Sequence, residues 1–231
     1  MITTDAEIKA ERKISENLFL LSVRLKRYME WIPGMFLQLS LETKSASEPW
    51  LDSRAFSFAS WGNENAKILV RREGNFTSEL ISKSESGFGT SVRYPFGKFL
   101  LNSGRDKVLI AGGAGISVFL SYLDYLNAND GLHQNVIIFH SSKRESEGMK
   151  RIYWDGIPAN VYLNQFITHK AEQNYTGRFS IGDLSKPLNH IYNPEYYICG
   201  PSEFNSYWMA ILNNLGVIPN VEQWVNQEAN R

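Results

Sequence analysis

The glycine-rich stretch LIAGGAGISVFLSY, residues 109–122, has the composition of a phosphate-binding turn. An apolar run ends in Gly112, Gly113 and Gly115, and a segment with helical periodicity begins at Ser117. Glycines let the backbone approach a ligand closely, and a helix start presents free N–H groups to an anion. Val118 stands where the dinucleotide-binding fingerprint has glycine or alanine. The stretch alone therefore predicts either a nucleotide-phosphate site or a tight turn inside an α/β core.

A second turn, Cys199-Gly200-Pro201, also follows an apolar strand pattern and precedes a helical one. Ligands of open α/β sheets bind outside the carboxyl ends of the strands, where such turns meet. Most lone cysteines are small buried hydrophobic residues. The place of Cys199 at a strand end makes a ligand contact the alternative interpretation.

Strands and helices alternate in the part of the chain that carries both turns. Apolar runs predict strands, and helical periodicity predicts the helices between and after them. The strands are expected at 107–113, 135–142, 160–167 and 195–201, and the helices at 117–129 and 202–216. This alternation is typical of a parallel sheet covered by helices on both faces.

The first hundred residues have a different pattern, with short strands and turns. Strands are expected at 17–25, 34–41 and 66–72, and turn residues stand at 33–34, 62–63 and 87–89. The sole helix signal is at 76–83, with its start at Thr77. An antiparallel barrel or sandwich is expected here, joined by a polar linker to the α/β part. The predicted domains are residues 1–102 and 103–231.

Composition excludes several classes of function. Lys plus Arg equals Asp plus Glu at 24 each, so no overall field attracts nucleic acid or an acidic membrane. The single cysteine excludes an internal disulfide or a thiolate cage for a metal cluster, and the four histidines lack metal-ligand spacing. The longest apolar run, 108–123, is too short to insert into a membrane, and the polar start MITTDAEIKAERK is no signal peptide. A cytoplasmic location is expected.

Six short motifs, taken in order, resemble those of the ferredoxin–NADP reductase-like flavoenzymes over nearly the whole chain. They are WIPGMFLQLSL (31–41), SRAFSFAS (53–60), REGNFTSEL (72–80), YPFGKF (94–99), LIAGGAGISVFLSYL (109–123) and YYICGP (196–201). Tyr94 replaces a usual glycine, and Val118 a usual proline. The resemblance implies two domains, an N-terminal antiparallel Greek-key β-barrel for FAD and an α/β parallel-sheet domain for the nicotinamide nucleotide.

The resemblance assigns flavin-binding roles to residues of the first domain. Arg54 would pair with a flavin phosphate, Phe56 would lie against the isoalloxazine or ribityl arm, and Ser57 would hydrogen-bond flavin N5. Without the resemblance, Arg54 is an ordinary surface cation and Phe56 an ordinary core residue. The other implied flavin contacts are Gly74 and Thr77 at a pyrophosphate turn, and Phe96 and Gly97 at the pocket wall.

The resemblance also assigns nucleotide-binding roles in the second domain. The pyrophosphate would lie on Gly112, Gly113, Gly115 and Ser117, and the loop of Cys199, Gly200 and Pro201 would face the nicotinamide. VEQW, residues 221–224, resembles the family's ending. Glu222 would hydrogen-bond toward Cys199, and Trp224 would cover the flavin. The implied catalytic residues are Ser57, Cys199 and Glu222.

The choice between NADH and NADPH stays open. Family members that use NADPH typically carry a Ser-Arg pair after the third strand, where this chain has Thr168-His169-Lys170. Ser142, Lys143 and Arg144 after the second strand form a cationic cluster that suits a 2′-phosphate. A solvated charged loop is the common alternative. No Asp or Glu ends that strand to bind a ribose hydroxyl.

The function implied is that of an FAD-dependent NAD(P)H oxidoreductase. It would pass a hydride from NAD(P)H to FAD and electrons to an acceptor such as ferredoxin or an oxygenase component. One alternative is an electron-transfer subunit of a larger complex. Another is a non-enzymatic binding module that retains the fold. The sequence identifies neither the acceptor nor the oligomeric state.

Overall fold

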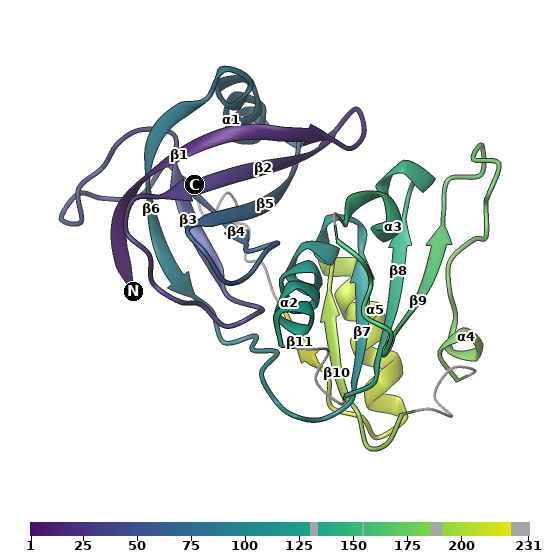
Figure 1. The fold of residues 1–231 in the computed structure, drawn as a ribbon. Helices are drawn as coiled ribbons and strands as arrows, with labels where there is room; N and C mark the ends of the chain where they lie inside the picture. Colours follow the sequence, from purple (N-terminus) through teal and green to yellow (C-terminus); the bar gives the residue numbers. More distant parts are fainter. Residues whose placement is uncertain (130–133, 154, 186–190, 223–231) are drawn as a thin grey trace.

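Two sheets organise the chain in the computed structural model, which describes residues 1–129, 134–153, 155–185 and 191–222 (Figure 1). The first sheet is antiparallel, with the order β4-β3-β6-β1-β2-β5. Its strands are β1 (Ile2–Lys13), β2 (Leu18–Leu25), β3 (Phe36–Ser40), β4 (Ser53–Ser57), β5 (Asn65–Arg71) and β6 (Phe88–Phe96), and α1 (Asn75–Ser86) connects the last two. A bridge between Phe58 and Ile68 joins the two ends of the sheet, so it curls toward a barrel.

The second sheet is parallel, with the order β11-β10-β7-β8-β9. Its elements are β7 (Lys107–Gly112), η1 (Gly113–Ile116), α2 (Ser117–Ala128), β8 (Val136–Ser142), η2 (Glu145–Glu147), α3 (Met149–Ile152), β9 (Val161–Ile167), α4 (Ile181–Ser185), β10 (Glu195–Cys199), α5 (Ser202–Asn214) and β11 (Asn220–Val221). The predicted fold class, an antiparallel barrel followed by a parallel α/β sheet, is confirmed. The predicted boundary at residue 102 falls in the segment between β6 and β7.

The longest strand, β1, was not predicted from the sequence. Of its twelve residues, only Thr4, Ala6 and Ile8 are buried, and charged side chains fill most other positions. The alternation is therefore short and easily missed. Two turn-related predictions were wrong in detail. Gly89 lies within β6, paired with Glu7 of β1, and α1 begins two residues before Thr77.

Tyr94, the residue that departs from the family motif, completes the barrel core. Its side chain is fully buried, and its ring lies edge-on to Trp31 and Phe58. Its hydroxyl donates to the Arg27 carbonyl and accepts the Met29 N–H. Because a buried tyrosine needs a partner for its hydroxyl, this pair of bonds makes the bulky residue compatible with the core.

The first half of strand β2, residues 18–21, is buried on both faces because the barrel packs against the second domain. Phe19 and Leu21 point into the barrel core, whereas Leu18 and Leu20 join a cluster that contains α2 residues. The side chains of strand β7 likewise belong to two different hydrophobic clusters. Leu109 belongs to the cluster shared with the barrel, and Val108 to the core under α5.

Polar contacts reinforce this interface along α2. The Ser121 hydroxyl donates to the Ser60 carbonyl at 2.9 Å, and the Trp61 N–H donates to the Asp124 carboxylate at 3.2 Å. Tyr125 lies edge-on to the Trp61 ring. Burial raises the pKa of Asp124 to about 6.

A carboxylate of the second domain is bound by two groups of the first. Glu147 accepts hydrogen bonds from the Arg71 guanidinium at 2.9 Å and the Ser15 hydroxyl at 2.7 Å. Its side chain is only 6% exposed. Burial opposes its ionisation, but the bonds from Arg71 and Ser15 outweigh burial and lower the pKa of Glu147. The ionised pair therefore links the domains.

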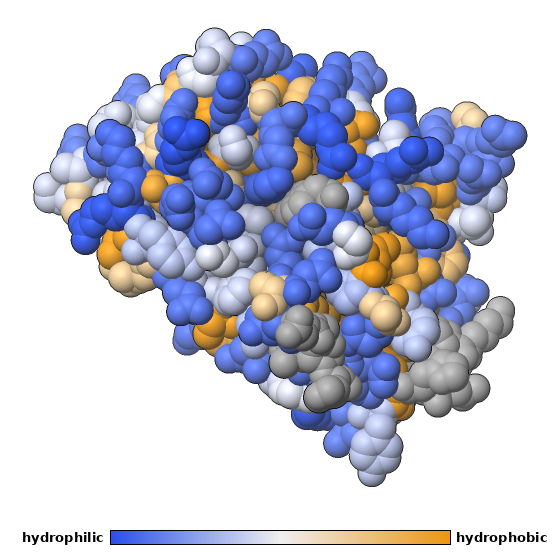
Figure 2. Space-filling model, in the orientation of Figure 1, coloured by the Kyte–Doolittle hydropathy of each residue, from blue (hydrophilic) through white to orange (hydrophobic). Residues whose placement is uncertain are grey.

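Polar side chains cover most of the face seen in Figure 2 and divide its hydrophobic areas. Within the part of the chain that the structure describes, no helix combines the length and the apolarity needed to cross a membrane.

We expect Glu147→Gln to reduce the free energy of unfolding by about 3 kcal/mol at neutral pH, because it leaves Arg71 without its buried partner. The folded-state pKa of Glu147 lies below the ordinary 4.5, so this contribution is present above pH 4.5 and is lost as the pH falls further. Urea unfolding at several pH values measures both effects.

Glu73→Gln is the matched control for this prediction. Glu73 lies 3.9 Å from the same arginine but is 73% exposed. Exposed ion pairs contribute roughly 1 kcal/mol or less. Equal losses in the two variants would contradict a special role for Glu147.

Candidate functional site

Strand β4 and the start of α1 meet through an aromatic ring. Arg54 and Phe56 lie on one face of β4, since side chains alternate along a strand. The Phe56 ring stacks on Phe76 of α1 with centroids 6.4 Å apart, and the Arg54 guanidinium lies 5.2 Å from the same ring centroid. Phe76 was not among the predicted site residues, although it lies inside the motif REGNFTSEL.

The first turn of α1 has the features of an anion site. Gly74 precedes the helix, and a Cβ added to it would meet no atom within 4 Å. The Thr77 hydroxyl oxygen accepts the N–H groups of Gly74 at 3.2 Å and of Glu73 at 2.9 Å. The sequence predicted that the helix starts at Thr77. In the structure Gly74 is the cap and Thr77 is the third residue of the helix. The first N–H groups of a helix have no acceptor within it, so they are available to a phosphate.

Ser57 lies on the opposite face of β4. It is 7% exposed and pairs with Phe36 of β3. The Phe36 ring stacks on Phe96 with centroids 5.6 Å apart, and Gly97 follows with a positive φ of 109°. A Cβ on Gly97 would lie 3.1 Å from the Phe36 ring. The predicted flavin residues therefore divide into two groups, one on each face of β4.

The two glycine turns of the second domain pack directly on each other. A Cβ on Gly115 would lie 2.3 Å from the Cys199 carbonyl oxygen, and one on Gly112 would lie 2.9 Å from the Phe204 ring. A Cβ on Gly200 would lie 2.7 Å from the Phe204 ring. These glycines therefore permit contact between the turns at the carboxyl ends of β7 and β10. Close approach of the backbone to a partner was predicted here from the glycines.

Gly113 differs from its neighbours because its surroundings are more open. Its φ is +55°, which favours glycine. A Cβ there would have the Arg71 guanidinium as its nearest neighbour, 3.7 Å away. Ser117, the first residue of α2, is 7% exposed, and Cys199, the last residue of β10, is 1% exposed. Pro201 precedes α5 and is exposed.

Glu222 lies beside the strand that ends at Cys199. Its N–H donates to the Ile198 carbonyl at 3.0 Å, and its own carbonyl accepts from the Asn205 side-chain amide at 2.7 Å. Burial raises the pKa of Glu222 to about 7. Asn205 was not among the predicted site residues, and nothing in its sequence context distinguishes it. Trp224 lies outside the described residues.

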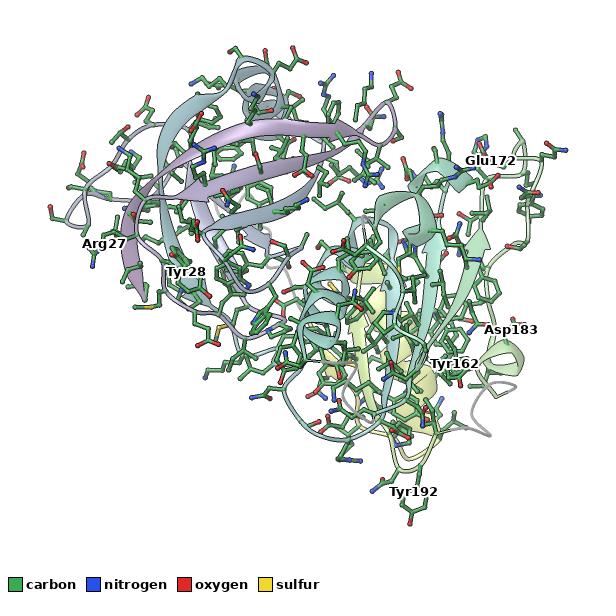
Figure 3. All side chains as sticks on the ribbon, in the orientation of Figure 1. Arg27, Tyr28, Tyr162, Glu172, Asp183 and Tyr192 are labelled. Atoms are coloured by element: carbon green, nitrogen blue, oxygen red, sulfur yellow. The ribbon has the colours of Figure 1, made fainter. Side chains whose placement is uncertain are left out.

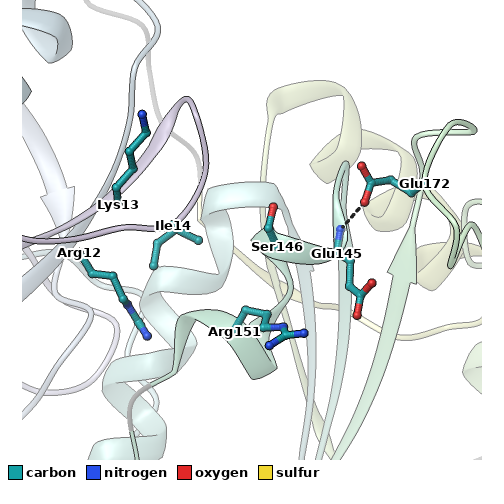
Figure 4. Close-up of a pocket in the computed structure, with 7 residues that line it drawn as sticks. All are labelled: Arg12, Lys13, Ile14, Glu145, Ser146, Arg151 and Glu172. Atoms are coloured by element: carbon teal, nitrogen blue, oxygen red, sulfur yellow. Dashed lines mark hydrogen bonds between the residues drawn. The ribbon is translucent and has the colours of Figure 1, made fainter.

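The cationic cluster after β8 has acidic neighbours. Ser142 is 2% exposed, and its hydroxyl donates to the Arg144 carbonyl, whereas Lys143 and Arg144 are exposed. The Glu145 N–H donates to the Glu172 carboxylate at 3.2 Å (Figure 4). Glu172 follows β9 at the carboxyl end of the sheet, and Tyr162 lies near the start of that strand (Figure 3). Glu145, the residue that follows the cluster, thereby brings the Glu172 carboxylate near it.

An open pocket of about 480 Å³ lies between the β1–β2 hairpin and this loop (Figure 4). Both signs of charge line it. The lining residues are Arg12, Lys13, Ile14, Glu145, Ser146, Arg151 and Glu172. It adjoins the cluster of Ser142–Arg144 along the chain, but those three residues are not part of its lining.

We expect Gly115→Ala to lower the free energy of unfolding by about 2 kcal/mol, because its Cβ would force the turn at Cys199 away. Gly104→Ala is the control, since a Cβ there meets no atom within 4 Å. That variant is expected to be as stable as the wild type or slightly more stable. Thermal unfolding compares them, and a neutral Gly115→Ala would show that the turns are not tightly packed.

The proteins that the chain is similar to include flavohemoproteins and a ferredoxin reductase. No family model matches it. The flavohemoprotein of Oceanobacillus iheyensis is 23% identical over 233 residues, which cover 93% of this chain and 57% of that protein. Among solved structures, the ferredoxin reductase in carbazole 1,9a-dioxygenase superposes with a TM-score of 0.78 at 20% identity, over 97% of this chain and 70% of that one.

A third protein matches the chain almost end to end. It is the flavohem-like FAD/NAD binding domain of nitric oxide dioxygenase from Vibrio cholerae O1 biovar El Tor, with a TM-score of 0.74 at 16% identity. The match covers 96% of this chain and 99% of that domain. By contrast, the chain spans little more than half the length of the curated flavohemoproteins that it matches. These comparisons confirm the resemblance predicted from the motifs: the chain has the two-domain fold of the ferredoxin–NADP reductase-like family.

Proposed function

We propose that this chain is an FAD-dependent NAD(P)H oxidoreductase that passes electrons to a separate acceptor. One observation carries the proposal. Arg71, at the end of β5, lies beside Gly113 of the glycine turn, and the start of α1 at Gly74 follows only three residues later. The two predicted phosphate sites therefore adjoin the same domain interface.

The barrel residues suit a flavin dinucleotide. The open space at Gly74 and the free N–H groups of the first turn of α1 would receive a pyrophosphate, with Arg54 as the nearby cation. Phe56 and Phe96 offer aromatic surfaces on the two faces of β4. When bound, FAD would supply the atom that accepts a hydride and the capacity to release electrons.

The glycine turn and its neighbours suit the nicotinamide nucleotide. Gly113 and the helix start that follows offer N–H groups, and Arg71 adds a positive charge at 3.7 Å from the Gly113 Cβ position. Cys199 and Glu222 would border the nicotinamide. With a pKa of about 7, the Glu222 carboxyl can hold a proton at neutral pH close to this strand end.

We expect NADH to be the faster donor. A 2′-phosphate at Ser142–Arg144 would meet the carboxylates of Glu145 and Glu172 in addition to the two cations. Carboxylates instead favour the free ribose hydroxyl, as in dinucleotide-binding sites generally.

The acceptor is a separate redox partner, for example ferredoxin or an oxygenase component. The similarity to a ferredoxin reductase of a dioxygenase supports this part of the proposal. The alternative is an electron-transfer subunit of a larger multicomponent complex. Size-exclusion of the native protein distinguishes the two, because a subunit would co-elute with its partners. A cytoplasmic location completes the proposal, since NAD(P)H is an intracellular donor.

The test is an anaerobic absorption titration of the FAD-loaded protein, first with NADH and separately with NADPH. Bleaching of the flavin band is the expected result, faster with NADH. A colourless protein that rejects added FAD would favour the non-enzymatic binding module. Bound flavin that neither nucleotide reduces would contradict the assignment of the glycine turn.

We expect Ser57→Ala to retain bound flavin but to slow its reduction by NAD(P)H roughly tenfold, because one hydrogen bond to the flavin is lost. Ser57→Thr keeps the hydroxyl and is the matched control. Stopped-flow absorption measures the rates. An unchanged rate in Ser57→Ala would remove this residue from the reaction.

A further inference from the structure

His140 is a fully buried histidine whose ring contacts the glycine turn. It lies on β8, between Ala111 of β7 and Gln165 of β9 in the sheet register. Its Nε2 is 3.0 Å from the Gly113 carbonyl oxygen. Its Nδ1 is buried and has no hydrogen-bond partner among the described residues.

The contact defines the protonation of the ring. A carbonyl oxygen only accepts, so Nε2 carries the hydrogen and donates it to Gly113. Nδ1 then holds a lone pair, which agrees with its having no acceptor nearby in the described part of the chain. Burial lowers the pKa of His140 to about 4, against the opposing effects of the Gly113 bond and of Glu147. The ring is therefore neutral at physiological pH, and the bond persists across that range.

The bond also fixes the orientation of the next peptide N–H. In a planar trans peptide, the C=O and the N–H that follows point in opposite directions. Because the Gly113 carbonyl points at the buried histidine, the Ala114 N–H points away from it. Ala114 stands in the first turn of a helical segment that runs without a break from η1 into α2, so its N–H lacks an acceptor within the helix.

We infer that His140 is a positioning residue that aims the Ala114 N–H at the pyrophosphate of the nicotinamide nucleotide. This inference rests on the proposed function, since it takes the glycine turn as the nucleotide site. It differs from a ligand contact because the ring acts through the Gly113–Ala114 peptide. The positive φ of Gly113 is the conformation that lets the carbonyl turn inward.

The experiment compares His140→Met with His140→Gln in the FAD-loaded chain of 231 residues. Methionine has a similar length and no donor, whereas the glutamine amide can donate to the Gly113 carbonyl. Titration calorimetry with NAD⁺ and with NADP⁺ measures the dissociation constant, and the steady-state reduction of ferricyanide by NADH and by NADPH measures kcat and KM. Phe139→Leu is the matched control, because Phe139 is equally buried on the same strand but packs on Phe179.

We expect His140→Met to raise the dissociation constant and KM roughly tenfold, with flavin content retained and kcat within about twofold. His140→Gln should recover most of the affinity, and Phe139→Leu should lose stability but no affinity. Where His140→Met does not fold, the same comparison is made between His140→Gln and the shorter His140→Asn.

Unchanged affinity in the variant without a donor would overturn the inference while leaving the proposed function intact. Equal weakening by both His140 variants would also overturn it, because the donor would then be irrelevant. A wild-type protein that binds neither nucleotide would overturn the proposed function and this inference together.

Discussion

The burial of the first half of β2 on both of its faces is the constraint on which the molecule depends. Phe19 and Leu21 fill the barrel, and Leu18 and Leu20 pack against the second domain. Apolar burial of this kind is the main stabilising contribution in folding. Because one strand contributes to both cores, the barrel and the parallel sheet cannot shift independently without exposing apolar surface. The turns at the edges of both sheets are thereby held along one interface.

Electrostatics then refine the same interface. Arg71 binds Glu147 and lies beside Gly113, so its guanidinium stands where the barrel, the η2 segment and the glycine turn meet. The pairing keeps a nearly buried carboxylate ionised. On the other side of the turn, a neutral histidine holds the Gly113 carbonyl. The turn thus has side chains from both domains beside it.

The glycines of the turn show that a sequence motif does not by itself identify a ligand site. Gly112 and Gly115 have no room for a side chain because protein atoms occupy it, whereas Gly113 faces a more open space. A ligand and a neighbouring loop place the same demand on a residue, namely the absence of a Cβ. The pattern therefore predicts close approach, and only the packing distinguishes the two kinds of partner.

The sequence by itself predicted the fold class and many of the strands and helices, because periodicity in segments such as 107–113 and 117–129 is a local property. It also located the two turns at strand ends. Strand β1 escaped because its few buried residues are separated by charges. Only the tertiary structure decided that Phe76 lies under Arg54, that Asn205 holds Glu222 and that His140 faces Gly113. Those contacts join residues far apart in the chain, and no local pattern encodes which distant groups the packing of two sheets brings together.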